Sequence, residues 1–405
     1  MTSPTTRPAP SGLLIANLLA QLAFGLLAMT ICLPSMQEWG AIFNTGQAAV
    51  QLTFSGYVVA YGSLQLLYGP LSDRIGRKKI LLFGLAVAFL GSVLAALAPN
   101  LPLLVAARVL QGAGAAAGMV VGRAMVQDLF QGPERTRVMA YVGMAMGLCP
   151  PLATIIGGQL HVRLGWQANF VVMAVLAVVL FVAAWRGLPD HQKATTVQPH
   201  WLRAMLSSYA RLGRERAFIL YVALLSMTTA TFYAFLGGAP IVLGSYGVKP
   251  DGIGYYIMCV PGAYIVGNYL ASHMAHRTGE RLMMGIGQAC TLAGIGLVVV
   301  LALAGLNTPL AFALPLMLVG IGHGLLVPPA LGGTIGLVPA LAGSAAAVAG
   351  LMQQMTGAVG GFAVGLFRHE GALNLGLLML GFALCGAFAQ WLLHRRPSKA
   401  GEVSR

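Results

Sequence analysis

Apolar residues recur along the chain in long continuous blocks, separated by short stretches of Pro, Gly and charged residues. A block of about 20 residues crosses the hydrocarbon core of a bilayer, about 30 Å thick, as an α-helix. Strands of a membrane barrel would instead alternate apolar and polar residues, and in lipid every backbone polar group must be satisfied internally. The pattern predicts twelve transmembrane helices, which begin near Leu13, Val50, Ile80, Leu103, Val138, Asn169, Phe218, Ile253, Leu282, Leu310, Ala345 and Ala372.

The composition supports this prediction, because 58% of the residues are hydrophobic and only 8% are charged, against about 25% charged in soluble domains. The 53 glycines suit helices that approach one another closely. Each of the five cysteines lies in an apolar block without a CxxC neighbour, so we expect neither a metal site nor a disulfide framework. The sequence therefore predicts an all-α polytopic membrane protein.

Lysine and arginine residues are concentrated in alternate loops of this topology. One set of loops, together with both termini, holds nearly all of them, whereas the opposite loops hold only Arg163, Lys249 and Arg368. By the positive-inside rule the basic set is cytoplasmic, which places both termini inside and requires an even number of helices. Topology then explains the net charge of +14, so we expect a lipid bilayer and no nucleic acid as a partner.

One predicted cytoplasmic segment is longer than the others and divides the chain. We expect an N-terminal six-helix bundle over residues 1–188, a linker over 189–216, and a C-terminal bundle with a cytoplasmic tail over 217–405. The linker has apolar residues at helical spacing from Trp201 to Leu212, with arginines among them. This pattern favours a basic amphipathic helix on the inner leaflet, and a solvated linker is the alternative.

The loops after the second and eighth helices resemble each other. Residues 73–78 read Asp-Arg-Ile-Gly-Arg-Lys, and residues 276–281 read His-Arg-Thr-Gly-Glu-Arg. The match falls where a duplicated six-helix unit would place it. Parallel repeats of this kind are typical of transporters whose solute site lies between the two halves at mid-membrane. We therefore predict two pseudo-symmetric six-helix bundles with a small-molecule site between them.

Several motifs resemble those of the major facilitator superfamily, over nearly the whole chain. The loop 69–79 is similar to the signature between helices 2 and 3, and residues 108–114 resemble the helix-4 motif of proton-driven exporters. Residues 143–151 of helix 5 resemble the motif of drug/proton antiporters. Leu33-Pro34 at the end of helix 1 and residues 343–345 at the start of helix 11 are similar to the bicyclomycin/chloramphenicol-resistance branch.

This resemblance implies a secondary transporter of the bacterial inner membrane that exports small toxic or drug-like solutes by proton antiport and alternating access. The proton would be the coupling ion, and no cofactor is implied. We expect the transporter to be a monomer. We also expect that it is not an enzyme, because the sequence has no HExxH motif and no nucleophile–base pair at mid-depth. It also has no GxxxxGK[ST] loop with which a nucleotide-driven pump would hold phosphates.

Charged residues near the cytoplasmic helix ends are candidates for a conformational latch. Asp73 would meet the positive N-terminal end of helix 11 across the two halves, and Arg77 would pair with Asp128. The resemblance implies that this latch is closed when the transporter faces outward, and the alternative is that the cations are only topology signals. The latch candidates are Gly69, Asp73, Arg74, Gly76, Arg77 and Asp128.

Helix 5 combines a double proline with small residues. We expect it to kink and to pack closely against its neighbours. The residues concerned are Gly147, Pro150, Pro151, Gly157 and Gly158.

Arg108 lies within helix 4, roughly 10 Å from its outer end by helical rise. A charge at that depth should face the bundle interior or a water-filled cavity, and is functional by default; snorkelling to the interface is the alternative. Gln111, one turn below, would share its polar pocket.

In helix 1, where the exporter branch carries an acid before its Leu-Pro ending, this chain has Thr30. An uncoupled facilitator, or an importer of a small metabolite, is therefore the alternative function.

His323 lies near the middle of helix 10, and its unperturbed pKa suits proton exchange. We expect it to take part in coupling or in substrate binding, and a histidine hydrogen-bonded to a neighbouring helix is the alternative.

Other polar residues in apolar blocks are candidates for the cavity wall, because burial against lipid would waste their hydrogen bonds. They are Gln21, Tyr57, Tyr61, Tyr233, Tyr264, Asn268, Gln353 and Gln354. With a central Arg108, such a cavity would suit neutral or anionic substrates better than multivalent cations.

Overall fold

The computed structural model describes residues 12–190, 207, 209–338, 341–368 and 370–395, and within them every regular element is a helix. The first half consists of α1 (Gly12–Thr30), the short 3-10 helix η1 (Leu33–Ser35), α2 (Met36–Ile42), α3 (Gln47–Ile75), α4 (Arg77–Ala96), α5 (Leu101–Leu129), α6 (Gly132–Leu164) and α7 (Gln167–Gly187). The second half consists of α9 (Arg216–Ser245), α10 (Pro250–Ile257), α11 (Cys259–Thr278), α12 (Glu280–Leu303), α13 (Pro309–Gly336), α14 (Ala342–Val364) and α15 (Ala372–His394).

Each predicted block corresponds to a helix or to a pair of helices that follow each other directly. The first block continues past α1 through η1 and α2, since Pro34 has no N–H with which to extend α1. The eighth block is divided at Met258 into α10 and α11. There Pro261 cannot bond to the carbonyl of Ile257, the last residue of α10. Proline chemistry thus accounts for both differences between prediction and structure.

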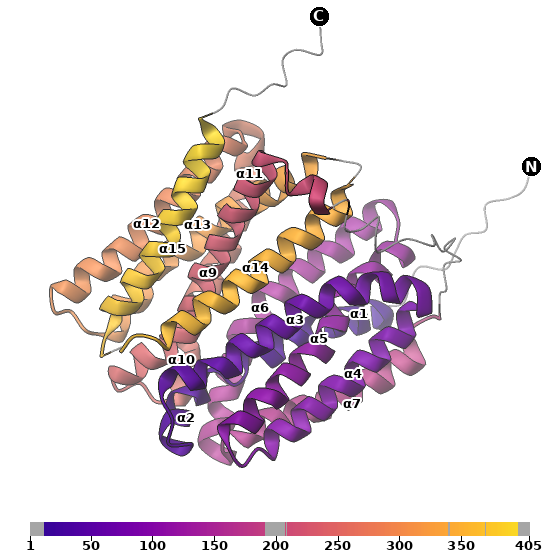
Figure 1. Ribbon diagram of the computed structural model, residues 1–405, viewed down its shortest axis with the longest axis horizontal. Coiled ribbons are helices and arrows are strands. Elements are labelled where there is room, and N and C mark those ends of the chain that lie inside the picture. Colours follow the sequence, from indigo (N-terminus) through magenta and orange to yellow (C-terminus); the bar gives the residue numbers. More distant parts are fainter. Residues whose placement is uncertain (1–11, 191–206, 208, 339–340, 369, 396–405) are drawn as a thin grey trace, which may run out of the picture.

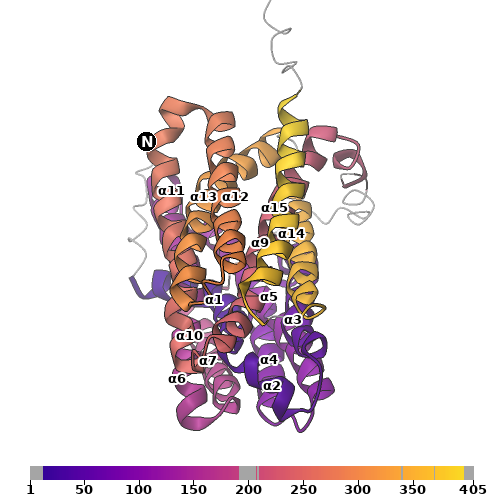
Figure 2. The same ribbon diagram turned by 90° about the vertical axis from the view of Figure 1, so that its left-hand side faces the viewer.

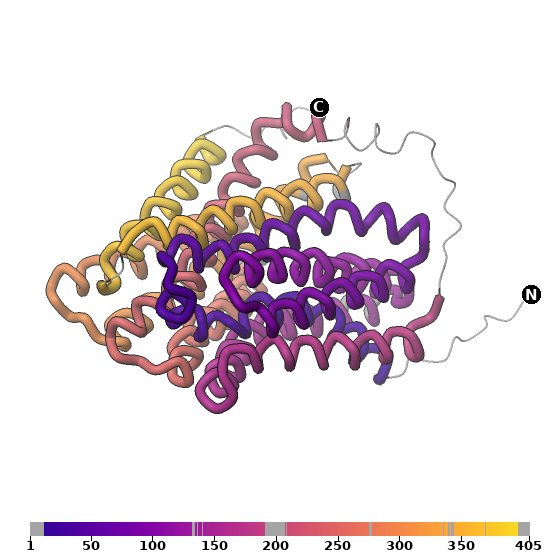
Figure 3. Tube along the Cα trace, turned by 60° about the horizontal axis from the view of Figure 1, so that its bottom comes forward, coloured from indigo at the N-terminus to yellow at the C-terminus, as the bar shows by residue number. Residues whose placement is uncertain are grey.

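Nine spans of the described chain are long and apolar enough to cross a bilayer, among them the continuous stretch Gly12–Ile42. The helices α3, α11 and α14 are not in that group, although they run beside its members. Instead of facing lipid alone, α3 packs against α14 and α11 packs against α6, across the boundary between the two halves. Figure 3 shows α3, in indigo, alongside α14, in yellow-orange. Polar and small residues are placed at this boundary instead of against lipid.

The two halves repeat one packing scheme. In the first half α5 packs against α1, α3 and α4, and α7 packs against α1 and α4. In the second half α13 packs against α9, α11 and α12, and α15 packs against α9 and α12. Figures 1 and 2 show the two sets of helices, indigo to magenta and rose to yellow, on opposite sides of the molecule. The predicted duplication of a six-helix unit is therefore visible in three dimensions.

Glycines at corresponding positions maintain this repeated packing. A Cβ on Gly112 of α5 would lie 2.4 Å from the carbonyl oxygen of Tyr57 on α3. Similarly, a Cβ on Gly320 of α13 would lie 2.2 Å from the carbonyl oxygen of Val260 on α11. The glycines two residues further along meet α4 and α12 in the same way. These helices approach so closely that any side chain at the contact would have to displace backbone.

The linker predicted over residues 189–216 lies mostly outside the described residues, so the predicted amphipathic helix from Trp201 onward is described only at its end. Tyr209 to Leu212 are helical, and Leu212 is fully buried against Phe218 of α9 and Ala345 of α14. The end of the linker is therefore anchored on the second half.

The two halves are in close contact at the end of the molecule that carries α2 and α10. The Gln51 amide donates a hydrogen bond to the Gly237 carbonyl (2.9 Å), and the Ser55 hydroxyl donates one to the Ala358 carbonyl (2.9 Å). Gly158 of α6 faces the Pro250 carbonyl so closely that a Cβ would lie 2.3 Å from it. Figure 2 shows α10 beside α6 at this α2/α10 end.

The opposite end, where α3 passes into α4 and which carries Arg74 and Arg77, is called the basic end here. Away from the α2/α10 end, the side chains of α3 from Ser63 to Leu66 and of α14 from Leu351 to Thr356 are partly exposed, whereas Tyr68 and Ser72 of α3 and Ala349 of α14 are buried. The boundary between the halves is thus closed at the α2/α10 end and more exposed in the middle of α3 and α14.

Candidate functional site

A cavity of about 370 Å³ lies between the halves. Helices α1 and α6 of the first half and α9, α11, α13 and α14 of the second half supply its wall. The lining residues are Leu26, Met29, Gly143, Met146, Gly147, Pro150, Thr228, Thr229, Phe232, Tyr233, Val260, Pro261, Tyr264, Gly320, His323, Val327, Gln353 and Gln354. None of these residues is an Asp, Glu, Lys or Arg. The cavity that the structure describes is therefore mainly apolar, with a few hydrogen-bonding groups and no carboxylate or fixed cation.

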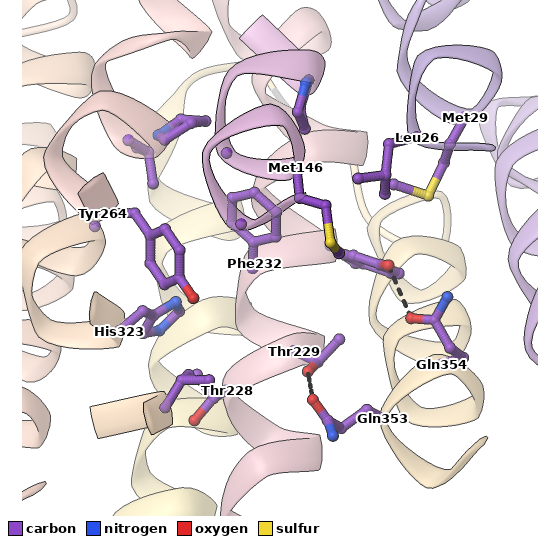
Figure 4. Close-up of a pocket in the computed structure, with 18 residues that line it drawn as sticks. Leu26, Met29, Met146, Thr228, Thr229, Phe232, Tyr264, His323, Gln353 and Gln354 are labelled. Carbon is purple, nitrogen blue, oxygen red and sulfur yellow. Dashed lines mark hydrogen bonds between the residues drawn. The ribbon is translucent and has the colours of Figure 1, made fainter. Parts of the chain in front are cut away.

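On one side of the cavity, hydrogen bonds join α9 to α14. The Tyr233 hydroxyl donates to the Gln354 side-chain oxygen (2.9 Å), and the Thr229 hydroxyl donates to the Gln353 side-chain oxygen (3.3 Å). Figure 4 shows both bonds at the cavity wall, with Met146 and Phe232 nearby. Each amide oxygen keeps a second lone pair, and the Gln354 amino group has no acceptor among the described residues, so a solute could form hydrogen bonds here.

On the other side, Tyr264 of α11 and His323 of α13 project into the cavity next to each other (Figure 4). The sequence Gly322-His323-Gly324 explains this placement. A Cβ on Gly322 would lie 2.4 Å from a backbone oxygen of α12, and one on Gly324 would lie 2.6 Å from the Tyr264 carbonyl oxygen. Since α13 is held tightly between α11 and α12, the imidazole is directed towards the cavity. Within the described residues, no group forms a hydrogen bond with it.

Arg108 lies inside the first half and does not line the cavity. It is fully buried, and Nη1 donates to the Ala28 carbonyl (2.8 Å) and to the Gln111 side-chain oxygen (2.5 Å). Nη2 donates to the Met29 carbonyl (3.3 Å), and the guanidinium lies 4.3 Å from the centre of the Tyr57 ring. The charge is therefore stabilised by backbone carbonyls at the end of α1 and by a cation–π contact, and it does not snorkel to the interface.

Five of the predicted cavity residues line the cavity; most of the others are buried inside the first half, and Asn268 is partly exposed and bonds to the Tyr264 carbonyl of its own helix. The Thr30 hydroxyl bonds to the Leu26 carbonyl of its own helix (2.8 Å), and the Tyr57 hydroxyl bonds to the Gly25 carbonyl (2.7 Å). The residues that line the cavity are His323, Tyr233, Tyr264, Gln353 and Gln354. Those that do not are Arg108, Gln111, Thr30, Tyr57, Tyr61, Asn268 and Gln21.

The predicted latch residue Arg77 makes contacts within the first half. Its Nε lies 3.3 Å from the Asp128 carboxylate of α5, Nη1 donates to the Ser72 hydroxyl (2.7 Å), and Nη2 pairs with Asp73. Gly76, which joins α3 to α4, has φ of 113°, a conformation that favours glycine. The Arg77–Asp128 pair therefore joins α4 to α5 within the first half.

The proline and glycine motif of helix 5 lies on α6, which is one continuous helix through Pro150 and Pro151. Gly147 and Pro150 line the cavity. Gly157 meets the Ile31 carbonyl, and Gly158 meets α10 across the boundary between the halves. The small residues therefore allow α6 to pack against both halves at once.

Comparisons with known proteins agree with this architecture. Residues 13–361 match the family model described as Major Facilitator Superfamily. The chain is 27% identical to multidrug resistance protein D of Escherichia coli, with 96% of this chain and 98% of that protein covered. It is 28% identical to a chloramphenicol resistance protein of Pseudomonas aeruginosa, with 83% and 80% covered.

A bicyclomycin resistance protein homolog of Haemophilus influenzae is 25% identical, with 94% of this chain and 97% of that protein covered. The crystal structure of a D-xylose-proton symporter superposes with a TM-score of 0.74 at 15% identity, covering 95% of this chain and 98% of the other. At that identity the symporter shows the fold alone. Because the family model spans most of the chain and the two halves repeat one helix packing, this integral membrane transport protein belongs to the major facilitator superfamily.

Proposed function

We propose that this protein exports small, uncharged, drug-like solutes across the bacterial inner membrane by proton antiport and alternating access, as a monomer. The observation that carries the proposal is the cavity between the halves, closed at the α2/α10 end and lined by apolar residues. The positive-inside rule would make the basic end cytoplasmic. In this conformation the cavity would then accept solute from the cytoplasmic side.

The relatives support a drug as the solute. Proteins at 25 to 28% identity are named for resistance to multiple drugs, to chloramphenicol and to bicyclomycin. The cavity has the complementary chemistry: Met29, Met146 and Phe232 offer apolar area, and Gln353 and Gln354 offer amide groups. Burial of apolar area contributes about 25 cal/mol per Å², while the amides would orient a polar solute.

The cavity lining disfavours ionised solutes, because a charge that leaves water without a partner costs several kcal/mol or more. With no carboxylate in the lining, multivalent cations lack a counter-charge. The earlier expectation that Arg108 would favour anions is no longer supported, since its guanidinium is buried in the first half. Neutral solutes are therefore the proposed class.

A facilitator is the second candidate function. The observation in its favour is that Thr30 occupies the place of the helix-1 acid and bonds only to its own helix, and that no acid lines the cavity. Such a protein would move solute down its gradient without proton flux.

Reconstitution into proteoliposomes decides between these functions. Chloramphenicol would serve as the uncharged probe and a dicationic viologen as the comparison, with an internal pH dye reporting proton flux. Chloramphenicol-dependent proton flux that dissipates an imposed pH gradient is expected for the antiporter. Solute movement without proton flux would establish the facilitator, and preference for the viologen would refute the proposed substrate class.

A further inference from the structure

We propose that His323 is the proton-binding group of this transporter, and that solute and proton exclude each other at the corner of the cavity formed by Tyr264 and His323. This inference rests on the proposed function as a proton antiporter, and it names the residue that couples the two movements.

The chemistry of the cavity wall leads to this residue. Direct competition between proton and solute requires a group that takes up and releases a proton near neutral pH, at a position that the solute also reaches. Among the described lining residues the ionisable side chains are those of Tyr233, Tyr264 and His323. Tyrosine titrates near pH 10 and histidine near pH 6.5 in water. His323 is therefore the lining group suited to proton exchange at physiological pH.

The imidazole is also free to act. A buried polar group with a purely structural role is normally hydrogen-bonded, and His161 illustrates this, since its Nε2 lies 2.9 Å from the Glu38 carboxylate. In the described part of the chain, His323 has no such partner and is 5% exposed, through the cavity. Its ring nitrogens are available to a proton or to a solute.

Among the described residues, the elements packed around α13 present no charge to His323. From α9 and α14 the cavity receives Thr228, Tyr233 and two glutamines, and from α11 it receives Tyr264. At Gly322, α12 presents Gly287 and the uncharged Thr291. Asp251 of α10 lies instead at the contact between α10 and Gly158 of α6. A protonated imidazole therefore depends on water in the cavity for its stabilisation.

Mutual exclusion follows from this dependence. A buried charge without a partner is costly, so a solute that displaces water from the imidazole favours its neutral form. When the cavity opens towards the basic end, solute binding would release one proton from His323 to the cytoplasm. When it opens towards the α2/α10 end, one proton would bind to the same nitrogen as the solute leaves. One proton then enters for each solute exported.

Three variants test this proposal: His323→Gln, His323→Glu and, as the matched control, His161→Gln. The first measurement is proton release when chloramphenicol is added to detergent-purified protein in weakly buffered solution. The second is chloramphenicol counterflow and proton flux in proteoliposomes. We expect H323Q to retain counterflow but to lose proton release and proton flux. H323E should restore both with an altered pH profile, and H161Q should behave like the wild type.

The affinity of wild-type protein for chloramphenicol should fall by up to tenfold per pH unit on the acidic side of the imidazole titration, and that of H323Q should not. Proton release that persists in H323Q would refute the inference alone. Identical behaviour of H323Q and H323E would assign His323 a structural role and refute it as well. Wild-type protein that moves chloramphenicol without proton flux would instead refute antiport, and the coupling role with it.

Discussion

The contact between α6 and α10 predicts how the conformational equilibrium can be shifted. Gly158 of α6 lies so close to α10 that a Cβ would be 2.3 Å from the Pro250 carbonyl oxygen. The substitution Gly158→Ala forces the two backbones apart at this point. Because α6 and α10 belong to different halves, that separation is also the first step in opening the α2/α10 end. The extra methyl group therefore destabilises only the conformation that is closed at the α2/α10 end.

The magnitude follows from the cost of overpacking, about 1 to 3 kcal/mol for an extra methyl group in a tight contact. A difference of that size between two states shifts their ratio by about 5- to 150-fold. Gly254→Ala should act similarly from the other side, since its Cβ would lie 2.6 Å from the Ile155 nitrogen of α6. Both variants should populate the conformation that is open at the α2/α10 end.

A cysteine at position 55 reports on this opening. Ser55 is buried and bonded across the boundary between the halves, so Ser55→Cys, in a background without native cysteines, should react slowly with a water-soluble maleimide. Gly158→Ala should raise that rate by about 5- to 150-fold. Gly91→Ala is the control: its Cβ would lie 2.4 Å from Gln111 within the first half, so it should lower thermal stability without changing the rate. An unchanged rate in Gly158→Ala, or an equal increase in the control, would refute the reasoning.

Three further changes test other parts of the structure. Met146→Glu places a carboxylate in a cavity that otherwise lacks one. A lipophilic monocation should then compete with chloramphenicol for binding at least about tenfold more strongly than it does in the wild type, because an opposite charge at close range is worth several kcal/mol at low dielectric. Arg108→Gln removes the donor to the Ala28 and Met29 carbonyls, so it should destabilise the protein by about 2 kcal/mol or more. We expect a lower melting temperature in detergent and an unchanged ratio of protons to solute in transport. Gly76→Ala strains a residue with φ of 113° and should cost about 1 to 3 kcal/mol, which the same melting experiment measures; an unaltered melting temperature in either variant would contradict the corresponding role.

The helices were predictable from sequence because bilayer thickness sets the length of each apolar block, and that signal is local. The division at Met258 was not predicted, although Pro261 carried the signal for it. The duplication could be recognised from two loops, and the paired glycines of α5 and α13 now give it a packing basis.

The cavity was only partly predictable, because a polar residue on a membrane helix gains equally from facing a cavity or another helix. Which of the two occurs depends on how each helix is rotated, and close glycine contacts determine that rotation. Tyr264 thus faces the cavity while Tyr57 bonds to the Gly25 carbonyl inside the first half. Met29 and Phe232 were missed altogether, since an apolar residue that lines a cavity looks in sequence like one that faces lipid.

The environment of Arg108 shows how this charge is stabilised although Thr30 stands where an acid was expected. The last carbonyls of a helix have no intrahelical partner, and here Pro34 also lacks the N–H that would bond to the Thr30 carbonyl. Arg108 donates to the carbonyls of Ala28 and Met29 in this last turn of α1, where the helix dipole is negative. The arginine therefore needs no carboxylate to be stable at membrane depth. Because this charge is permanent and fully buried, Arg108 does not itself exchange a proton, which agrees with the proposal that His323 of the second half does so.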